Sequence, residues 1–172
     1  MKKSMAGLFF AVLLSGLLVW SRPGNPLQAN AGGADGSRYG KYIISKDIYR
    51  VIPEEYTGTS LLSHNGELKA GVSMGYHCVT KPISFNETHT HGNEEILCFI
   101  GGNPQDITDF GAEIEMTMGP ERETHVFRQT TCVSIPANLA HCPLSIRKVT
   151  KPIVFLEISL TSSYKAPGSN YR

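Results

Sequence analysis

Neither sign of charge dominates this chain, which carries 16 lysine and arginine residues against 15 aspartate and glutamate residues, for a net charge of +1. Such a balance supplies no electrostatic attraction to nucleic acid or to an anionic membrane surface. We therefore expect no nucleic acid partner, and no stable association of the folded domain with a membrane.

The chain also lacks a long helical pattern and an internal repeat. No segment places apolar residues at helical spacing over about a dozen positions, and residues 106–110 suit one short helical turn at most. With 172 residues the chain has room for one ordinary domain and not for two. These absences argue against a helical bundle and against a multidomain protein.

Short β-prone runs separated by glycine-rich or asparagine-rich turns are present instead. Residues 113–118 alternate polar and apolar side chains at period two, as a half-buried strand does. Many short strands with turn signals at fairly even spacing predict a β-sandwich or barrel. The expected strands cover residues 42–44, 49–52, 68–79, 96–100, 113–118, 124–128, 131–135 and 153–160.

The N-terminus has the pattern of a secretory signal. Lys2 and Lys3 precede an apolar run over residues 8–20, and Ala29-Asn30-Ala31 forms an A-x-A cleavage site. Cleavage after Ala31 and export to the periplasm or the medium are expected; the alternative is an uncleaved membrane anchor. The expected organisation is a signal peptide at 1–31, a flexible leader at 32–40, the folded domain at 41–165 and a tail at 166–172.

The four cysteines contain no C-x-x-C pair, which argues against a dithiol redox motif. After export Cys78, Cys98, Cys132 and Cys142 could form two disulfides in any of three pairings. Alternatively all four are small buried hydrophobic residues. Cys142, next to His141, could also be a reactive thiol or lie beside a metal.

The most informative stretch is His89-Thr90-His91-Gly92-Asn93-Glu94-Glu95. Residues two apart on a strand point to the same face, so His89 and His91 can aim at one point, and Glu95 keeps the same parity. His141, in a later Pro-x-Asn-x2-His turn, is the fourth candidate. Three imidazoles and one carboxylate suit a first-row divalent metal, and iron, manganese, zinc and nickel all remain possible.

These residues resemble the two motifs of the cupin superfamily, G-x5-H-x-H-x3-4-E-x6-G and G-x5-P-x-G-x2-H-x3-N. The first motif is matched by His89, His91, Glu95 and Gly102, and the second by Pro136 and His141. The sequence departs from the motifs by having Ile83 and Thr130 at the leading glycines, Asn138 at the turn glycine and Ser145 at the closing asparagine. Asparagine accepts the left-handed backbone conformation better than most residues.

The resemblance implies a single-domain, all-β double-stranded β-helix, the jelly-roll barrel of the cupins. It also implies that His89, His91, Glu95 and His141 bind the metal at the mouth of a pocket for a small molecule. Cupins include dioxygenases, decarboxylases, isomerases and lyases, among which a fold does not choose. Single cupins commonly pair through a sheet edge, so a homodimer is expected.

Acid–base candidates are Tyr76 and His77, on the strand before the first motif, and His125, on the strand before the second. His64, in a Ser-His-Asn-Gly turn, is expected to be solvated, and Glu94 is expected to face away from the metal. Two hypotheses follow: an exported metal-dependent enzyme acting on a small polar organic molecule, or a non-catalytic protein that binds or senses such a ligand through the metal.

Overall fold

The computed structural model describes residues 38–44, 48–51 and 56–164, with the side chains of residues 49–51 excepted. The expected signal peptide, the leader up to residue 37 and the tail from residue 166 lie outside the described residues, so their assignment stays a prediction. Within the described residues, no helix is both long enough and apolar enough to cross a membrane.

Strands make up nearly all of the regular structure in the described residues. One short 3-10 helix, η1 (Gly40–Tyr42), precedes them. The strands are β1 (Tyr49–Val51), β2 (Thr59–Ser63), β3 (Ser73–Val79), β4 (Ile83–Phe85), β5 (Glu95–Gly101), β6 (Glu113–Met118), β7 (Glu123–Phe127), β8 (Thr131–Ile135), β9 (His141–Arg147) and β10 (Ile153–Ser159).

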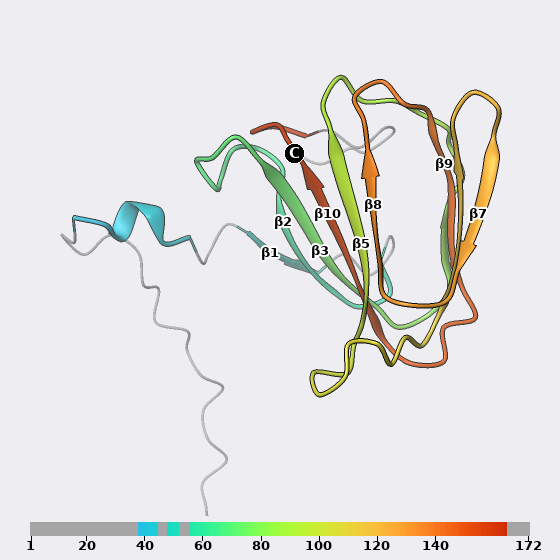
Figure 1. The fold of residues 1–172 in the computed structure, drawn as a ribbon. Helices are drawn as coiled ribbons and strands as arrows, with labels where there is room; N and C mark the ends of the chain where they lie inside the picture. The colour runs from blue at the N-terminus through green and yellow to red at the C-terminus, as the bar shows by residue number, and fades with distance from the viewer. Residues whose placement is uncertain (1–37, 45–47, 52–55, 165–172) are drawn as a thin grey trace, which may run out of the picture. The chain divides into compact units, whose positions relative to one another are not determined.

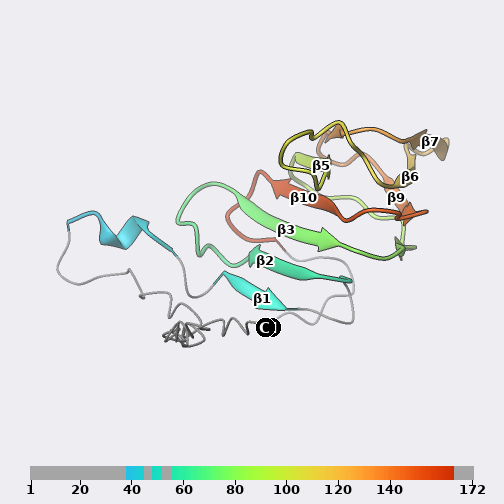
Figure 2. The same ribbon diagram turned by 90° about the horizontal axis from the view of Figure 1, so that it is seen from below.

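The strands form two antiparallel sheets that face each other (Figure 1). The larger sheet has the order β1-β2-β3-β10-β5-β8, and the smaller sheet has the order β4-β9-β6-β7. Of strands β3 to β10, four lie side by side in each sheet. The chain crosses between the two sheets as it does in an eight-stranded jelly roll. In Figure 2, β1 and β2 extend the larger sheet at the edge remote from the smaller one.

The hydrophobic core lies between the sheets and follows the period of two in each strand. Leu97 and Phe99 point inward from β5, and Ile114 and Met116 point inward from β6. Phe99 stacks on Phe155 of β10 with ring centroids 5.0 Å apart. The prediction of a jelly-roll fold is confirmed.

Most of the expected strands are confirmed, but five local expectations differ from the structure. The segment at 42–44 is wrong as a strand, because Tyr42 ends the 3-10 helix, and residues 106–110 form turns instead of a helical turn. Three strands were missed: β2, β4 and β9. β2 and β9 contain polar residues or a proline in place of a clean apolar alternation, and β4 has only three residues. Pairing with neighbouring strands decides the conformation of all three.

Candidate metal centre

Backbone hydrogen bonds bring the two sequence motifs together. His89 and His141 form an isolated antiparallel bridge in which each backbone N–H donates to the other residue's carbonyl, at 3.1 and 3.0 Å. The Asn138 N–H donates to the His91 carbonyl at 2.7 Å. Asn138 has φ of 65°, which confirms that asparagine takes the left-handed conformation at this turn.

Three of the four expected ligands have their ligating atoms together inside the barrel. One ligating atom each from His91, Glu95 and His141 lie within 4.8 Å of one another. Glu95 begins β5 and is 2% exposed, and His141 begins β9 and is also 2% exposed. Glu95 Oε2 lies 3.4 Å from His141 Nε2 and 3.8 Å from His91 Nε2.

Backbone carbonyls fix the tautomer of two histidines. His141 Nδ1 lies 3.0 Å from the Leu139 carbonyl, and His89 Nδ1 lies 2.8 Å from the Glu87 carbonyl. A carbonyl only accepts hydrogen bonds, so in the neutral form of each ring the proton is on Nδ1 and the lone pair is on Nε2. A metal-binding histidine is held in this way by a partner on its other ring nitrogen.

The carboxylate of Glu95 is oriented by Ser159 of β10. The Ser159 hydroxyl donates to Glu95 Oε1 at 3.2 Å, which leaves Oε2 facing the imidazoles. Burial lowers the pKa of His141, but the contact with Glu95 and the Leu139 carbonyl outweigh it, so the pKa lies above its usual value. Burial lowers the pKa of His91, and His89 and His141 lower it further against the attraction of Glu95.

A divalent metal fits this arrangement of donors. His91 Nε2 is buried and, among the residues that the structure describes, has no hydrogen-bond partner. A buried polar atom without a partner is costly, and such atoms require an explanation. Two imidazole nitrogens and a carboxylate oxygen, all buried and convergent, are the donors that first-row divalent metals take.

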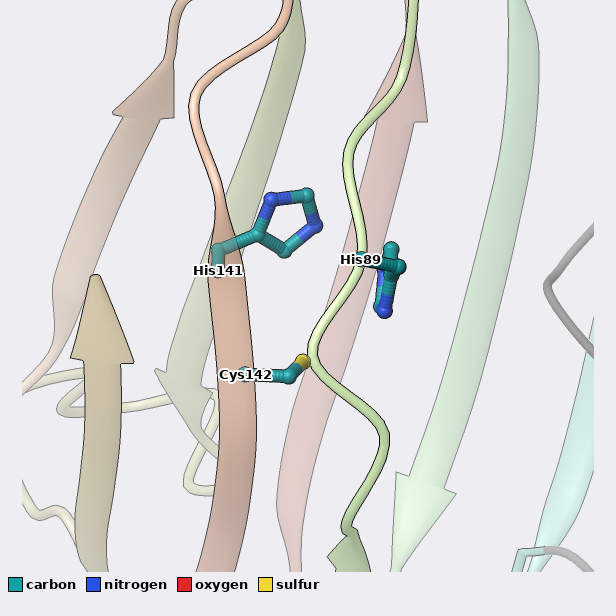
Figure 3. Close-up of side chains that lie close together, drawn as sticks. All are labelled: His89, His141 and Cys142. Atoms are coloured by element: carbon teal, nitrogen blue, oxygen red, sulfur yellow. The ribbon is translucent and has the colours of Figure 1, made fainter. Parts of the chain in front are cut away.

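His89 belongs to the cluster through His141 and not through Glu95. Its ring centroid lies 4.3 Å from that of His141 and 4.8 Å from that of His91. One ligating atom each from His89, His141 and Cys142 form a second group within 4.8 Å (Figure 3). The two groups share His141, so Cys142 lies beside the candidate metal ligands, which was one of the alternatives drawn from the sequence. Burial raises the pKa of its thiol to about 12.

The three acid–base candidates lie in different environments. Tyr76 of β3 is 39% exposed, and the side chain of His125 on β7 is 48% exposed, beside Glu123. His77 is fully buried, with Nδ1 2.8 Å from the Ser60 hydroxyl and its ring stacked on Tyr56. Of the three, only His77 lies inside the barrel.

Two inward-facing residues were missed from the sequence, and one expectation is wrong. His64 is 6% exposed, not solvated, because the Asn65–Ser163 bridge and the ring of Tyr164 cover the end of β2. Glu157 of β10 meets His64, with Oε1 3.1 Å from Nε2. Its parity with Phe155, a core residue, was the available signal, since a carboxylate at the inner position of an apolar strand is unusual.

Comparison with protein-family models and with curated proteins finds no match. Among solved structures, the chain is similar to a variant of Bacillus subtilis oxalate decarboxylase, at 16% identity and TM-score 0.46, over 70% of this chain and 29% of that one. It is also similar to an oxalate oxidase, at 13% identity and TM-score 0.43, over 60% of this chain and 51% of that one. A cupin superfamily protein from Desulfitobacterium hafniense matches at 13% identity and TM-score 0.37, over 52% of this chain and 67% of that one.

The chain spans less than a third of the length of the oxalate decarboxylase chains, 28 to 29%. At such identities and TM-scores these likenesses say nothing of this chain's activity. The chain's own structure defines its class: eight strands in jelly-roll order, with the two cupin-like motifs hydrogen-bonded to each other inside the barrel. The fold is a cupin-type jelly roll with a histidine and glutamate cluster that could hold a metal ion.

Proposed function

We propose that this chain is an exported, metal-dependent cupin enzyme that acts on a small polar organic molecule. The observation that carries the proposal is the convergence of His91 Nε2, His141 Nε2 and Glu95 Oε2 inside the barrel. His89 completes the proposed set of four ligands through its contacts with His91 and His141. The metal itself remains open among iron, manganese, zinc and nickel.

When bound, such a metal supplies Lewis acidity toward a substrate oxygen or lowers the pKa of a bound water. The residues of the chain do the rest. Glu95 and the three imidazoles would hold the ion, and the apolar core next to them would exclude bulk water from that side. Tyr164, which is 9% exposed, meets the ring of His91 edge-on and helps to bury this candidate ligand.

The test is turnover by the full chain, purified without an affinity tag and loaded in turn with each of the four metals. Small hydroxylated and carboxylated compounds are screened with the metal-loaded protein, the metal-depleted protein and the Glu95→Gln variant. The proposal predicts a reaction that requires the metal and is lost in the variant. Metal-dependent binding of a compound with no turnover of any compound would favour the second candidate, a non-catalytic protein that binds or senses its ligand.

Export and dimerisation belong to the proposal as well. Fractionation of cells that express the full chain is expected to find the protein outside the cytoplasm and shortened to begin after Ala31. Light scattering on that protein is expected to give the mass of a homodimer. A full-length cytoplasmic protein, or a monomer, would remove that part of the proposal and leave the metal centre unaffected.

A further inference from the structure

A second polar cluster lies inside the barrel, beside the candidate metal centre. Glu157 follows Phe155 on the inner face of β10, and Ser159, the next residue on that face, is the register partner of Glu95. Residues two apart along a strand are separated by roughly 7 Å. Glu157 therefore lies one inner-face position along β10 from Ser159, whose hydroxyl holds Glu95, and its side chain is 13% exposed.

The neighbouring strand makes room for this carboxylate. Gly75 of β3 is the register partner of Glu157. A Cβ atom placed on Gly75 would lie 2.5 Å from Glu157 Oε1 and 2.6 Å from His77 Nε2. The carboxylate thus occupies the space that a side chain at position 75 would fill.

Glu157 carries its negative charge at neutral pH. Burial alone raises the pKa of a carboxyl group, but His64 and His77 outweigh it and lower the pKa of Glu157 to about 2. His64 Nε2 lies 3.1 Å from Oε1, whereas His77 Nε2, at 3.8 Å, is beyond hydrogen-bond distance. The carboxylate therefore keeps lone pairs available to a further donor.

Two buried polar atoms on β3, the strand beside Glu157, have unused hydrogen-bonding capacity. Within residues 56–164, His77 Nε2 and Ser73 Oγ lack a hydrogen-bond partner, although His77 is 0% and Ser73 is 1% exposed. Both residues lie on the inner face of β3, one on each side of Gly75. Buried atoms of this kind normally meet a protein group, a water or a ligand.

A series of ring contacts joins this cluster to the metal centre. The ring of Tyr164 lies edge-on to His91, at 5.2 Å between centroids, and edge-on to His64, at 5.1 Å. His64 in turn contacts Glu157. Tyr164 therefore contacts one residue of each group, the candidate ligand His91 and His64 of the second cluster.

We propose that Glu157, His77 and Ser73 form a substrate subsite, which receives a hydroxyl or ammonium group at the far end of a molecule whose carboxylate meets the metal. This inference rests on the proposed function, and it names the substrate class as hydroxy or amino carboxylic acids. An ionised carboxylate accepts hydrogen bonds and donates none, so it attracts a hydroxyl or ammonium group. It repels a second carboxylate, so dicarboxylic acids are disfavoured.

Four acids of equal chain length and different far ends separate these cases: butyrate, 4-hydroxybutyrate, 4-aminobutyrate and succinate. Their dissociation constants are measured by calorimetry on the manganese-loaded full chain at pH 7. The corresponding three-carbon and five-carbon acids are measured in the same way, so that the result does not depend on whether a four-carbon acid has the right length. The hydroxy or the amino acid is expected to bind about tenfold more tightly than butyrate at one chain length, as one hydrogen bond to a charged group provides. Succinate is expected to bind more weakly than butyrate.

Glu157→Gln keeps the shape of the side chain and removes its charge. In this variant the hydroxy or amino acid is expected to bind about as tightly as butyrate, and succinate is expected to bind no more weakly than butyrate. Glu94→Gln, at an exposed position next to Glu95, is expected to keep both differences in affinity. Equal binding of all four acids, no binding of any, or an unchanged preference in Glu157→Gln would overturn the subsite. Failure of the protein to bind any of iron, manganese, zinc or nickel would instead overturn the proposed function.

Discussion

At the scale of single residues, three of the four candidate ligands are held by a partner on the side away from the cluster. His89 and His141 use backbone carbonyls, and Glu95 uses the hydroxyl of Ser159. Such supporting contacts fix which atom faces the metal, and their loss usually costs a metal site tenfold to a hundredfold in affinity, as an order of magnitude. The candidate centre is therefore sensitive to residues that do not touch the metal.

Ser159→Ala tests this dependence. The substitution removes the hydrogen bond to Glu95 Oε1 and frees the carboxylate to turn away from the imidazoles. Metal affinity, measured by competition with a chelator, is expected to fall by about tenfold to a hundredfold. Ser84→Ala removes a hydroxyl contact with Ser145 at an exposed place and serves as the matched variant. Equal affinities in the two variants would contradict the supporting role of Ser159.

Glu113 provides a test by pH. Its side chain is 3% exposed and accepts hydrogen bonds from Lys148, Arg128 and Arg147, which lower its pKa to about 2 from an ordinary 4.5. A carboxyl group with a depressed pKa stabilises the fold above the unfolded pKa, and this stability is lost as the pH falls toward 2. Urea unfolding between pH 5 and 2 is expected to show this loss, at roughly those limits.

Glu113→Gln should remove this part of the pH dependence, because glutamine does not titrate. The variant is expected to be less stable than the wild type at neutral pH and to approach it at the acid end. If the free energy of unfolding of the variant fell with pH as steeply as that of the wild type, Glu113 would not be the group responsible.

At the scale of elements, β3 combines two tasks. Its inner face packs the core through Val79, and it also carries Ser73, Gly75 and His77 on the strand beside Glu157. Gly75 is required where it stands, because the carboxylate and the His77 ring occupy the space of a Cβ atom. Gly75→Ala is therefore expected to lower the free energy of unfolding by about 1–3 kcal/mol, the usual cost of overpacking.

Denaturant unfolding of Gly75→Ala beside Gly71→Ala measures that cost. A Cβ atom placed on Gly71 would meet no other atom within 4 Å, so its substitution creates no clash. The expected result is a clear loss of stability at position 75 and little change at position 71. Equal stability of the two variants would show that β3 and β10 can separate at Gly75 without cost.

The pair β5 and β8 offers a test of the cysteines. Cys98 and Cys132 are register partners with Sγ atoms 3.2 Å apart, on the face of β5 opposite to Leu97 and Phe99. Glutathione disulfide is expected to oxidise them by exchange: both thiol protons are lost, one S–S bond forms, and the oxidant leaves as two thiols. Closing this loop of 34 residue steps should stabilise the fold by roughly 2–4 kcal/mol.

Peptide mapping without reduction identifies the pairing. The expected product links Cys98 to Cys132. Cys142 lies inside the barrel beside His141 and should stay reduced. Cys78 and Cys142 should therefore both react with an alkylating agent once the protein is unfolded. A Cys78→Ser variant should form the same link. A disulfide that includes Cys78 or Cys142 would contradict the single link that the contact between Cys98 and Cys132 predicts.

The sequence was informative where a signal is local and less so where pairing across the barrel decides. The spacing from His89 to Glu95, the left-handed Asn138 and the alternation in β6 were all predictable from a few adjacent residues. Strand β9 was not, because His141 and Cys142 are both buried at its start and a register shift interrupts its pairing with β6. His64 and Glu157 are 93 positions apart (157 − 64), and only the sheet brings them together.

At the scale of the whole molecule, the jelly roll brings distant parts of the chain to one place. Glu95 and His141 start β5 and β9, which belong to different sheets, and the His89–His141 bridge joins the first motif to the start of β9. A metal bound there would hold the two sheets together. Because a ligand that binds only the folded chain stabilises it by mass action, metal loading and folding should be coupled.

The most direct measurement of the central claim is the metal content of the full chain by elemental analysis, after purification without a tag. It is made for the wild type, for a His91→Ala and His141→Ala double variant, and for His125→Ala, which changes an exposed histidine. The account predicts about one equivalent of a divalent transition metal in the wild type and in His125→Ala, and none in the double variant. Equal metal content in all three proteins, or none in the wild type after reloading, would contradict it.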